Sequence, residues 1–433
     1  MKRYKLLSIL IVCCLLWSSC STGSNHANDK GLPKEDHAKE ITIEVQDFGT
    51  NFYVNAAKKF EEETGVKVNV INDFKVGQSD EEVAANQERI QAELMAGKGA
   101  DIYSDIFLDF TDIGKNNHLC NIADWVADDP GFSNDTYFMD IMKSEFDSGN
   151  VYSIPLFMYF SALGSTIEVP ELNGKNLNWE DFFTLTKGTK RNGVLYGITD
   201  YRLFHRRYRE RYDQFINEKN KTQNLDTPDM VKLMKQCKTW SKEGLCIPVN
   251  TDNIAEISSK VFFDEPGGGD MDLLINFRFN NPNLSNEPYF YDIPSDSDKN
   301  DKSNKISTTS FLCINSASPN KGTSWKFVKY LLSEEIQVTG QFTPVNRKAA
   351  EEHIKKNLND TKRYFKLNID TNKTIKECEV ILDSVTQVSN YVNKTETDKI
   401  VLEEAKRFFN NEITAEAAAK NMADRVALYF KEQ

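Results

Sequence analysis

Histidine and cysteine are scarce in this sequence, which limits the chemistry it can perform. The chain has 433 residues but only five histidines and eight cysteines. No CxxC pair occurs, so neither a zinc ribbon nor a redox motif is indicated. The HExxH and GxSxG patterns of two large hydrolase classes are also absent. We therefore predict no catalytic residues and no enzymatic activity, although a pair of catalytic carboxylates among the 65 acidic residues stays open.

Long apolar runs are missing outside the N-terminus. The run from Leu6 to Trp17 is too short to span a bilayer as a mature helix, and it follows a basic start at residues 1–5. Ser18 and Ser19 then precede Cys20, which resembles a bacterial lipoprotein signal. We predict that residues 1–20 form this signal peptide and that Cys20 carries lipid, such as palmitate. The alternative is a plain secretory signal that is cleaved nearby.

Basic residues are outnumbered, with 53 lysines and arginines against 65 acidic residues and a net charge of -12. Such a chain repels a phosphate backbone, so nucleic-acid binding is not expected. Asp296, Asp298 and Asn300 mimic the start of a calcium loop, but Asp301 and Ser307 replace the glycine and the glutamate that the loop needs. We predict neither a metal ion nor a cofactor.

The segment after the signal is polar, and the domain that follows it alternates strands with helices. Residues 21–39 lack apolar periodicity and predict a flexible tether. Alternating apolar residues predict a strand over 41–45. The next predicted elements are a helix capped by Thr50 or Asn51, a strand over 66–70, a helix from Ser79 to Gly97 and a strand over 101–108. This βαβαβ order is typical of α/β proteins with a parallel sheet covered by helices.

Five segments resemble, in the right order, parts of extracellular solute-binding proteins of the sugar type, the maltodextrin-binding group. They are FEEETGVKV at 60–68, LMAGKGADI at 94–102, GNVYSIP at 149–155, INSASPNK at 314–321 and ITAEAA at 413–418. The resemblance covers nearly all of the mature chain. It implies a two-lobed, periplasmic-binding-protein-like fold of type II, with a ligand cleft between the lobes that closes by hinge motion.

The resemblance also implies how the chain is divided and what it does. We predict lobe 1 at residues 40–153 and 308–342, and lobe 2 at residues 154–307 and 343–433. The implied function is that of a monomeric lipoprotein on the outer face of the bacterial plasma membrane. It captures a carbohydrate or oligosaccharide and delivers it to the membrane subunits of an ABC importer. A secreted polysaccharide-processing enzyme, or a ligand sensor or adhesin module with the same fold, stays open as an alternative.

Candidate ligand contacts follow the first and third predicted strands and the first crossing between lobes. Ligands in open α/β sheets sit beyond the carboxyl ends of strands. The candidates at these places are Asp47, Phe48, Thr50, Asn51, Asp109 and Tyr159. The resemblance implies that Asp47 and Asp109 stand where maltodextrin binders place carboxylates near sugar hydroxyls, and that Tyr159 occupies another contact position.

Other conspicuous residues have two interpretations each. The four tryptophans at 125, 179, 240 and 325 are predicted to be core residues, which leaves tyrosine and phenylalanine to stack on a sugar. The arginines at 206, 207, 209 and 211 form a solvated basic face or supply a cleft arginine for an acidic sugar. Cys237 and Cys246 are near enough in sequence to form a disulfide, or they are buried free thiols.

Overall fold

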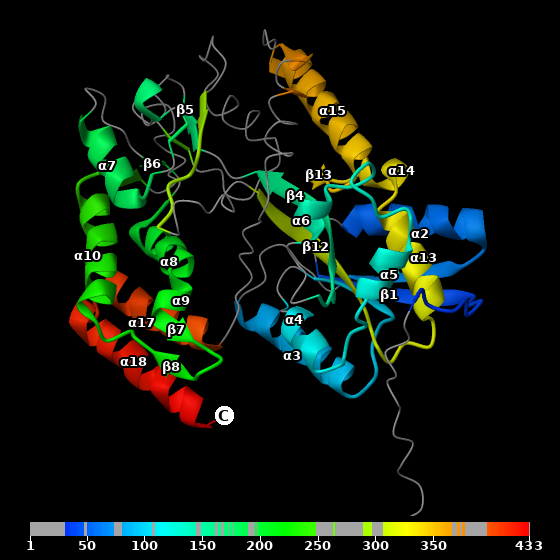
Figure 1. Cartoon of the computed structure of the whole chain (residues 1–433), viewed down its shortest axis with the longest axis horizontal. Coiled ribbons are helices and arrows are strands. Elements are labelled where there is room, and N and C mark those ends of the chain that lie inside the picture. Colours follow the sequence, from blue (N-terminus) through cyan, green and yellow to red (C-terminus); the bar gives the residue numbers. More distant parts are fainter. Residues whose placement is uncertain are drawn as a thin grey trace, which may run out of the picture.

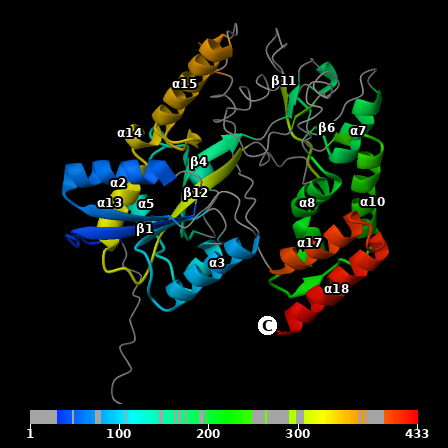
Figure 2. The same cartoon turned by 180° about the vertical axis from the view of Figure 1, so that it is seen from behind.

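The structure is a computed structural model of the whole chain. It describes residues 31–46, 50–72, 80–105, 108, 110–143, 149–160, 163–165, 169–172, 174–175, 177–188, 195–196, 198–247, 263–264, 289–296, 306–365, 370–372, 375–376 and 396–432. The described elements form two bodies that stand side by side in both views (Figures 1 and 2). Each body has its own sheet and its own hydrophobic core, so the fold is mixed α/β with two lobes.

Lobe 1 is built on a six-stranded sheet with the order β13-β4-β12-β3-β1-β2. Its strands are β1 (Glu40–Gln46), β2 (Lys67–Asn72), β3 (Ile102–Asp105), β4 (Ile154–Phe160), β12 (Ile306–Ile314) and β13 (Thr343–Pro344). The first three strands are parallel, whereas β12 is antiparallel to both β3 and β4. The predicted βαβαβ start and its parallel sheet are confirmed.

Helices cover both faces of this sheet. Alternate residues of β1 point to opposite faces, so each face contributes side chains to its own layer of packing. Ile41, Ile43 and Val45 face the core that α2 and α13 close with Phe60 and Phe327. The opposite face packs against Ile90 and Leu94 of α3. The helices of lobe 1 are α2 (Thr50–Thr64), α3 (Asp80–Met95), α4 (Phe110–Lys115), α5 (Ala123–Asp128), α6 (Met139–Met142), α13 (Lys321–Leu331), α14 (Glu334–Gln337) and α15 (Arg347–Phe365).

Lobe 2 has a smaller sheet with the order β11-β5-β10-β6-β9. These strands are β5 (Leu163–Ser165), β6 (Leu195–Tyr196), β9 (Cys246–Ile247), β10 (Phe263–Asp264) and β11 (Tyr289–Tyr291). A two-stranded ribbon, β7 (Ile216–Asn217) and β8 (Thr222–Gln223), lies beside the helices. The helices are the 3₁₀ turn η2 (Pro170–Leu172), α7 (Trp179–Gly188), α8 (Asp200–Glu210), α9 (Tyr212–Phe215), α10 (Pro228–Lys242), α17 (Glu396–Phe409) and α18 (Ala415–Glu432).

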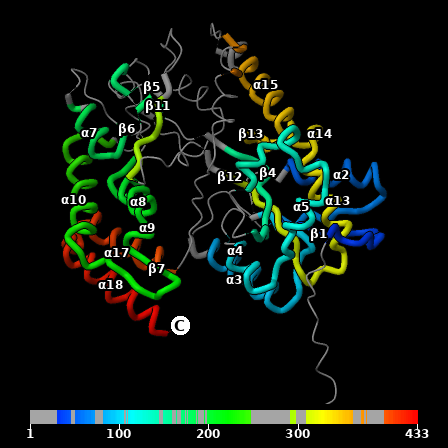
Figure 3. The backbone as a smooth tube through the Cα atoms, in the orientation of Figure 1, coloured from blue at the N-terminus to red at the C-terminus, as the bar shows by residue number. Residues whose placement is uncertain are grey.

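Two predicted domain borders differ from the way the strands pair. The borders at Ile154 and Thr343 assign β4 and β13 to lobe 2, whereas both strands hydrogen-bond within the sheet of lobe 1. Leu156 and Val345 are buried in the core of lobe 1, and α15 contacts β13 and α14. The chain therefore passes between the lobes after β4, after β11 and after α15, as the colour changes along the tube show (Figure 3).

The predicted fate of the tryptophans is confirmed, and the cysteine alternatives are resolved. Trp125, Trp179, Trp240 and Trp325 are all buried in one of the two cores. Cys237 and Cys246 are buried free thiols, as are Cys120 and Cys313. Burial raises the pKa of the Cys237 and Cys246 thiols. Within the described part of the chain, no helix combines the length and the apolar character needed to cross a membrane.

Candidate functional site

The parallel strands of lobe 1 end at one edge of the sheet. This edge lies toward the strands that connect lobe 1 with lobe 2. Gln46, the last residue of β1, pairs with Asp105, the last residue of β3. Because β12 enters from lobe 2 and runs antiparallel to β3, the carboxyl ends of β1, β2 and β3 all lie on the side toward that crossing. Carboxyl ends of parallel strands are the usual ligand edge of open α/β sheets.

Two strands extend past this edge and join the lobes. The strand β12 pairs with β3 only from Phe311 onward, but it pairs with β4 from Ile306. Its first residues therefore form a ribbon with β4 beyond the end of β3, and β13 pairs with the other side of β4 at Phe157 and Met158. Ser310, a buried residue in a left-handed conformation with φ of 58°, stands where β12 leaves β3. The backbone thus changes its path at the base of the ribbon that leads to lobe 2.

Packing fixes the start of α2 against this edge. The hydroxyl of Tyr53 and that of Ser104 in β3 lie 2.7 Å apart in a buried hydrogen bond. The ring of Phe52 meets that of Phe157 in β4 edge-on, with centroids 5.1 Å apart. These contacts tie the first turn of α2 to β3 and β4. The start of α2 is thereby held near both the ligand edge and the interlobe ribbon.

A partly buried ion pair holds α3 to the other face of the sheet. Arg89 of α3 pairs with Glu44, whose side chain in β1 is 3% exposed, and also with Glu93 at 3.2 Å. The hydrogen bond to Glu44 raises the pKa of Arg89, and the guanidinium stays charged. Since Arg89 has two carboxylate partners, we assign this cluster a structural role at the sheet rather than a role in ligand binding.

The structure describes some of the predicted contact residues and not others. Asp47, Phe48 and Asp109 lie outside the described residues. Thr50 and Asn51 form the start of α2 and not a preceding N-cap, and Asn51 is exposed. Tyr159 belongs to β4 and pairs in register with Ser307 of β12. Tyr159 therefore stands in the ribbon that joins the lobes, two residues beyond Phe157.

The arginines of α8 match neither interpretation drawn from the sequence. Arg207 pairs with Asp296 at 2.7 Å, and the exposed fractions of the two side chains are 4% and 10%. Arg206 lies 3.4 Å from Glu210, and Arg209 lies 3.7 Å from Asp398. These guanidinium groups are inside lobe 2, so they form neither a solvated basic face nor an anion site in a cleft.

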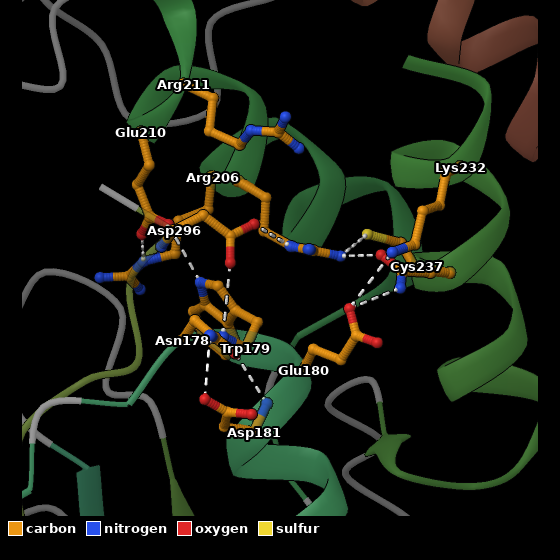
Figure 4. A network of polar contacts seen from close by, with 12 residues as sticks. Asn178, Trp179, Glu180, Asp181, Arg206, Glu210, Arg211, Lys232, Cys237 and Asp296 are labelled. Carbon is orange, nitrogen blue, oxygen red and sulfur yellow. Dashed lines mark hydrogen bonds and ion pairs between the residues drawn. The ribbon is translucent and has the colours of Figure 1, made fainter. Parts of the chain in front are cut away.

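Asp296 and Glu210 are the centre of this polar network. Asp296 accepts hydrogen bonds from the guanidinium of Arg207 and, at 3.4 Å, from the backbone N–H of Trp179. Its own N–H donates to Glu210 Oε2 at 2.8 Å, which also accepts the indole N–H of Trp179 at 3.1 Å. The network ties β11 and the start of the return crossing to α7 and α8 (Figure 4). From the sequence alone, Asp296 stands out only as the first residue of an incomplete calcium-loop motif.

Burial gives Glu210 an unusual protonation equilibrium. Burial raises the pKa of Glu210 to about 7, and the nearby Arg206 only partly offsets this effect. A carboxyl with a raised pKa in the fold adds stability below its ordinary pKa of 4.5, and this contribution is lost as pH rises through about 7.

We therefore expect a Glu210-dependent loss of stability of about 2 kcal/mol between pH 5.5 and pH 8. The measurement is urea unfolding of the wild type and of Glu210→Gln at several pH values. Glutamine keeps the shape but does not titrate, so the variant should lose less stability over this range. Equal pH slopes for both proteins would show that Glu210 does not titrate in this way.

No group of three or more potential metal-ligating side chains occurs among the residues that the structure describes. Asp296, the first residue of the calcium-loop mimic, instead pairs with Arg207. The described part of the chain therefore gives no donor set on which to build a metal site.

Comparison with known proteins identifies the family. Residues 55–362 match the family of bacterial extracellular solute-binding proteins. No curated protein sequence matches the chain. The family match covers more than half of the sequence and includes β2 to β13, which are all strands of the lobe 2 sheet and all strands of the lobe 1 sheet except β1.

Solved structures show the same fold at low sequence identity. A putative oligosaccharide periplasmic-binding protein from Synechococcus sp. MITs9220 aligns with a TM-score of 0.63 and 11% identity, covering 90% of this chain and 99% of the other. An ABC transporter solute-binding protein from Thermotoga lettingae, bound to α-D-tagatose, gives 0.57 and 17%, covering 91% and 100%. The GacH receptor of Streptomyces glaucescens, solved with acarbose, gives 0.55 and 17%, covering 91% and 99%. The family match and the shared two-lobed fold agree, and the chain belongs to the bacterial extracellular solute-binding protein family.

Proposed function

We propose that this protein captures a carbohydrate or oligosaccharide outside the cell and delivers it to an ABC importer. The observation that carries the proposal is the ligand edge of lobe 1, where the ends of β1 and β3 are neighbours beside the ribbon to lobe 2. The tagatose and acarbose complexes of proteins with the same fold support a sugar as the class of solute.

The residues at this edge suit a sugar. Asp47 directly follows Gln46 of β1, and Asp109 lies four residues after the end of β3. Carboxylates accept charge-assisted hydrogen bonds from sugar hydroxyls, and an aromatic ring such as that of Tyr159 covers the C–H face of a sugar. Because β1 and β3 are adjacent strands, we propose that the two carboxylates bind one solute from lobe 1.

Closure follows from the way the lobes are joined. The ribbon of β4 and β12 connects two lobes that have separate cores, which favours hinge motion of one lobe relative to the other. A solute that contacts both lobes stabilises the closed form by its differential affinity for that form. The importer then distinguishes the loaded protein by its closed shape.

We expect Asp47→Ala and Tyr159→Ala each to weaken solute binding by more than tenfold. Loss of a hydrogen bond to a charged group costs about 1.5–3 kcal/mol, and loss of a stacking face removes an aromatic contact. A thermal-shift screen against sugars, uronates, peptides and polyamines first identifies the solute. Calorimetry with that solute then compares the variants with the wild type.

Asp124→Ala is the matched control, because Asp124 is an exposed carboxylate in the first turn of α5. It should bind like the wild type. If Asp47→Ala and Tyr159→Ala also bind like the wild type, the site lies elsewhere. Release of shorter products from an oligosaccharide during the titration would instead identify an enzyme.

We also propose that Cys20 carries the lipid that holds the protein at the outer face of the plasma membrane. Cys20→Ala should therefore yield a protein that partitions into the aqueous phase of a detergent extraction and lacks the lipid mass. Cys14→Ala, a change within the apolar part of the signal, should leave anchoring intact. A Cys20→Ala protein that still carries lipid would refute this assignment.

A further inference from the structure

The segment just before β1 is attached to lobe 1 at the first turn of α13. Asp36 Oδ2 accepts a hydrogen bond from the backbone N–H of Thr323 at 3.1 Å, and Asp36 Oδ1 accepts another from the hydroxyl of Thr323. The N–H of Ala38 donates to Asp36 Oδ1 at 3.1 Å, which turns the segment back toward β1. The sequence analysis predicted a flexible tether up to residue 39, so these residues differ from that prediction.

The helix α13 needs a capping group from elsewhere in the chain. Asn320 precedes the helix but makes no capping hydrogen bond with its side chain. Its amide instead donates to Asp101 Oδ1 at 3.2 Å. The first N–H groups of a helix lack partners within the helix, and aspartate is among the best residues to satisfy them. Asp36 supplies this function from a position 287 residues away in the sequence.

A glycine allows the segment to lie directly on the helix. A Cβ atom placed on Gly322 would stand 2.2 Å from the carbonyl oxygen of Lys34. This close approach leaves no space for a side chain at position 322. Glu35 forms an ion pair with Lys326 one turn further along α13. Backbone contact, cap and ion pair thus fall on consecutive residues of one short segment.

We propose that residues 34–38 form a strap that fastens the membrane tether to lobe 1 at the start of α13. The inference rests on the proposed lipid at Cys20. The strap makes lobe 1 the anchored lobe and leaves lobe 2 as the lobe that moves on closure. The strap lies before the amino end of β1, whereas the ligand edge lies at the carboxyl end of the same strand. The attachment point and the proposed solute site therefore lie at opposite ends of β1.

The strap also shortens the reach of the tether. With residues 34–38 attached, the chain between Cys20 and the strap spans at most about 50 Å when fully extended. If the tether were free up to Glu40, its largest span would be about 70 Å. The strap thus keeps lobe 1 closer to the membrane, where the importer subunits are.

Hydrogen exchange on the full lipidated chain tests the strap itself. Asp36→Ala removes the cap and should speed exchange at residues 34–39 and in the first turn of α13 by about fivefold or more, as expected for the loss of a capping aspartate. Glu35→Ala is the control within the same segment, because its ion pair is exposed, and it should change exchange by less than about twofold. Gly322→Ala should act like Asp36→Ala by steric displacement.

Energy transfer from a dye on lobe 1 to a labelled lipid tests the consequence for the tether. Vesicles of phosphatidylglycerol and phosphatidylethanolamine that carry the lipidated wild type should show stronger transfer than those with Asp36→Ala or Gly322→Ala. Unchanged exchange in Asp36→Ala, or equal transfer in all variants that bind vesicles, overturns the proposal. Failure of the wild type itself to float with vesicles is a separate result, which refutes the lipid anchor and leaves the exchange test of the strap valid.

Discussion

Asp296→Ala is expected to destabilise lobe 2 by about 3–5 kcal/mol, because it leaves Arg207 as an uncompensated charge inside the lobe. The pair is 2.7 Å apart, and both side chains are almost fully buried. The change also removes the acceptor for the backbone N–H of Trp179. For a lobe of this size, the loss corresponds to a fall in Tm on the order of 10 °C.

The control for this experiment comes from the same helix region. Arg211 pairs with Asp229, but the side chain of Asp229 is 63% exposed. Asp229→Ala should therefore cost less than about 1 kcal/mol, since exposed ion pairs contribute little. Differential scanning calorimetry on both variants gives the comparison. Similar Tm values for Asp296→Ala and Asp229→Ala would mean that the buried network does not stabilise lobe 2.

Phe327→Ala should have an effect of similar size on lobe 1. Phe327 is fully buried in α13, and its ring meets that of Phe60 in α2 with centroids 5.1 Å apart. Truncation of a buried phenylalanine costs about 3–5 kcal/mol, because it loses apolar contacts and leaves a cavity. The two helices it joins cover the same face of the lobe 1 sheet.

Because the two lobes have separate cores, the two variants should affect different parts of the unfolding profile. We expect calorimetry to show that Phe327→Ala lowers the Tm of the lobe 1 transition and leaves that of lobe 2 unchanged. Asp296→Ala should lower the Tm of the lobe 2 transition and leave that of lobe 1 unchanged. Val54→Ala, at a position 46% exposed on α2, is the control for lobe 1 and should change Tm little. Identical profiles for both core variants would indicate that the lobes unfold as one unit.

Local sequence patterns were sufficient for the start of the fold. Alternation at Ile41, Ile43 and Val45, and helical spacing around Phe60, predict β1 and α2, and both are present. Their pattern depends only on neighbours in the chain, and burial of one face follows from it. Helical patterns over Trp179–Lys187 and Pro228–Glu243 likewise predict α7 and α10, and both are present, the second with Thr227 as its cap.

Sequence patterns do not predict the structure where contacts between distant segments of the chain determine it. The apolar run of β4 reads equally well as the start of lobe 2, and only its pairing with β12 assigns it to lobe 1. The sequence pattern suggests a solvated Arg207 because its partner Asp296 is 89 residues away. The sequence around Asp36 predicts a polar tether, because its neighbours give no sign that its hydrogen-bond partner is Thr323. The i,i+4 spacing of Arg206 and Glu210 was the one local signal of the buried network.

The candidate site was predictable in outline. The rule that ligands lie beyond the carboxyl ends of parallel strands selects the edge at Gln46 and Asp105, and the structure places those ends side by side. Which side chains touch the solute depends on loop conformation, on which the periodicity of the sequence gives no information. Asp47, Asp109 and Tyr159 therefore stay predictions that the binding experiment decides.

The central claim is that a solute binds between the two lobes and closes them. Small-angle X-ray scattering on the purified protein, with and without the solute found in the thermal-shift screen, tests it most directly. At saturating solute the radius of gyration should fall, because the lobes approach each other around the ribbon of β4 and β12. Saturated binding with an unchanged radius of gyration would contradict the account and place the solute on one lobe alone.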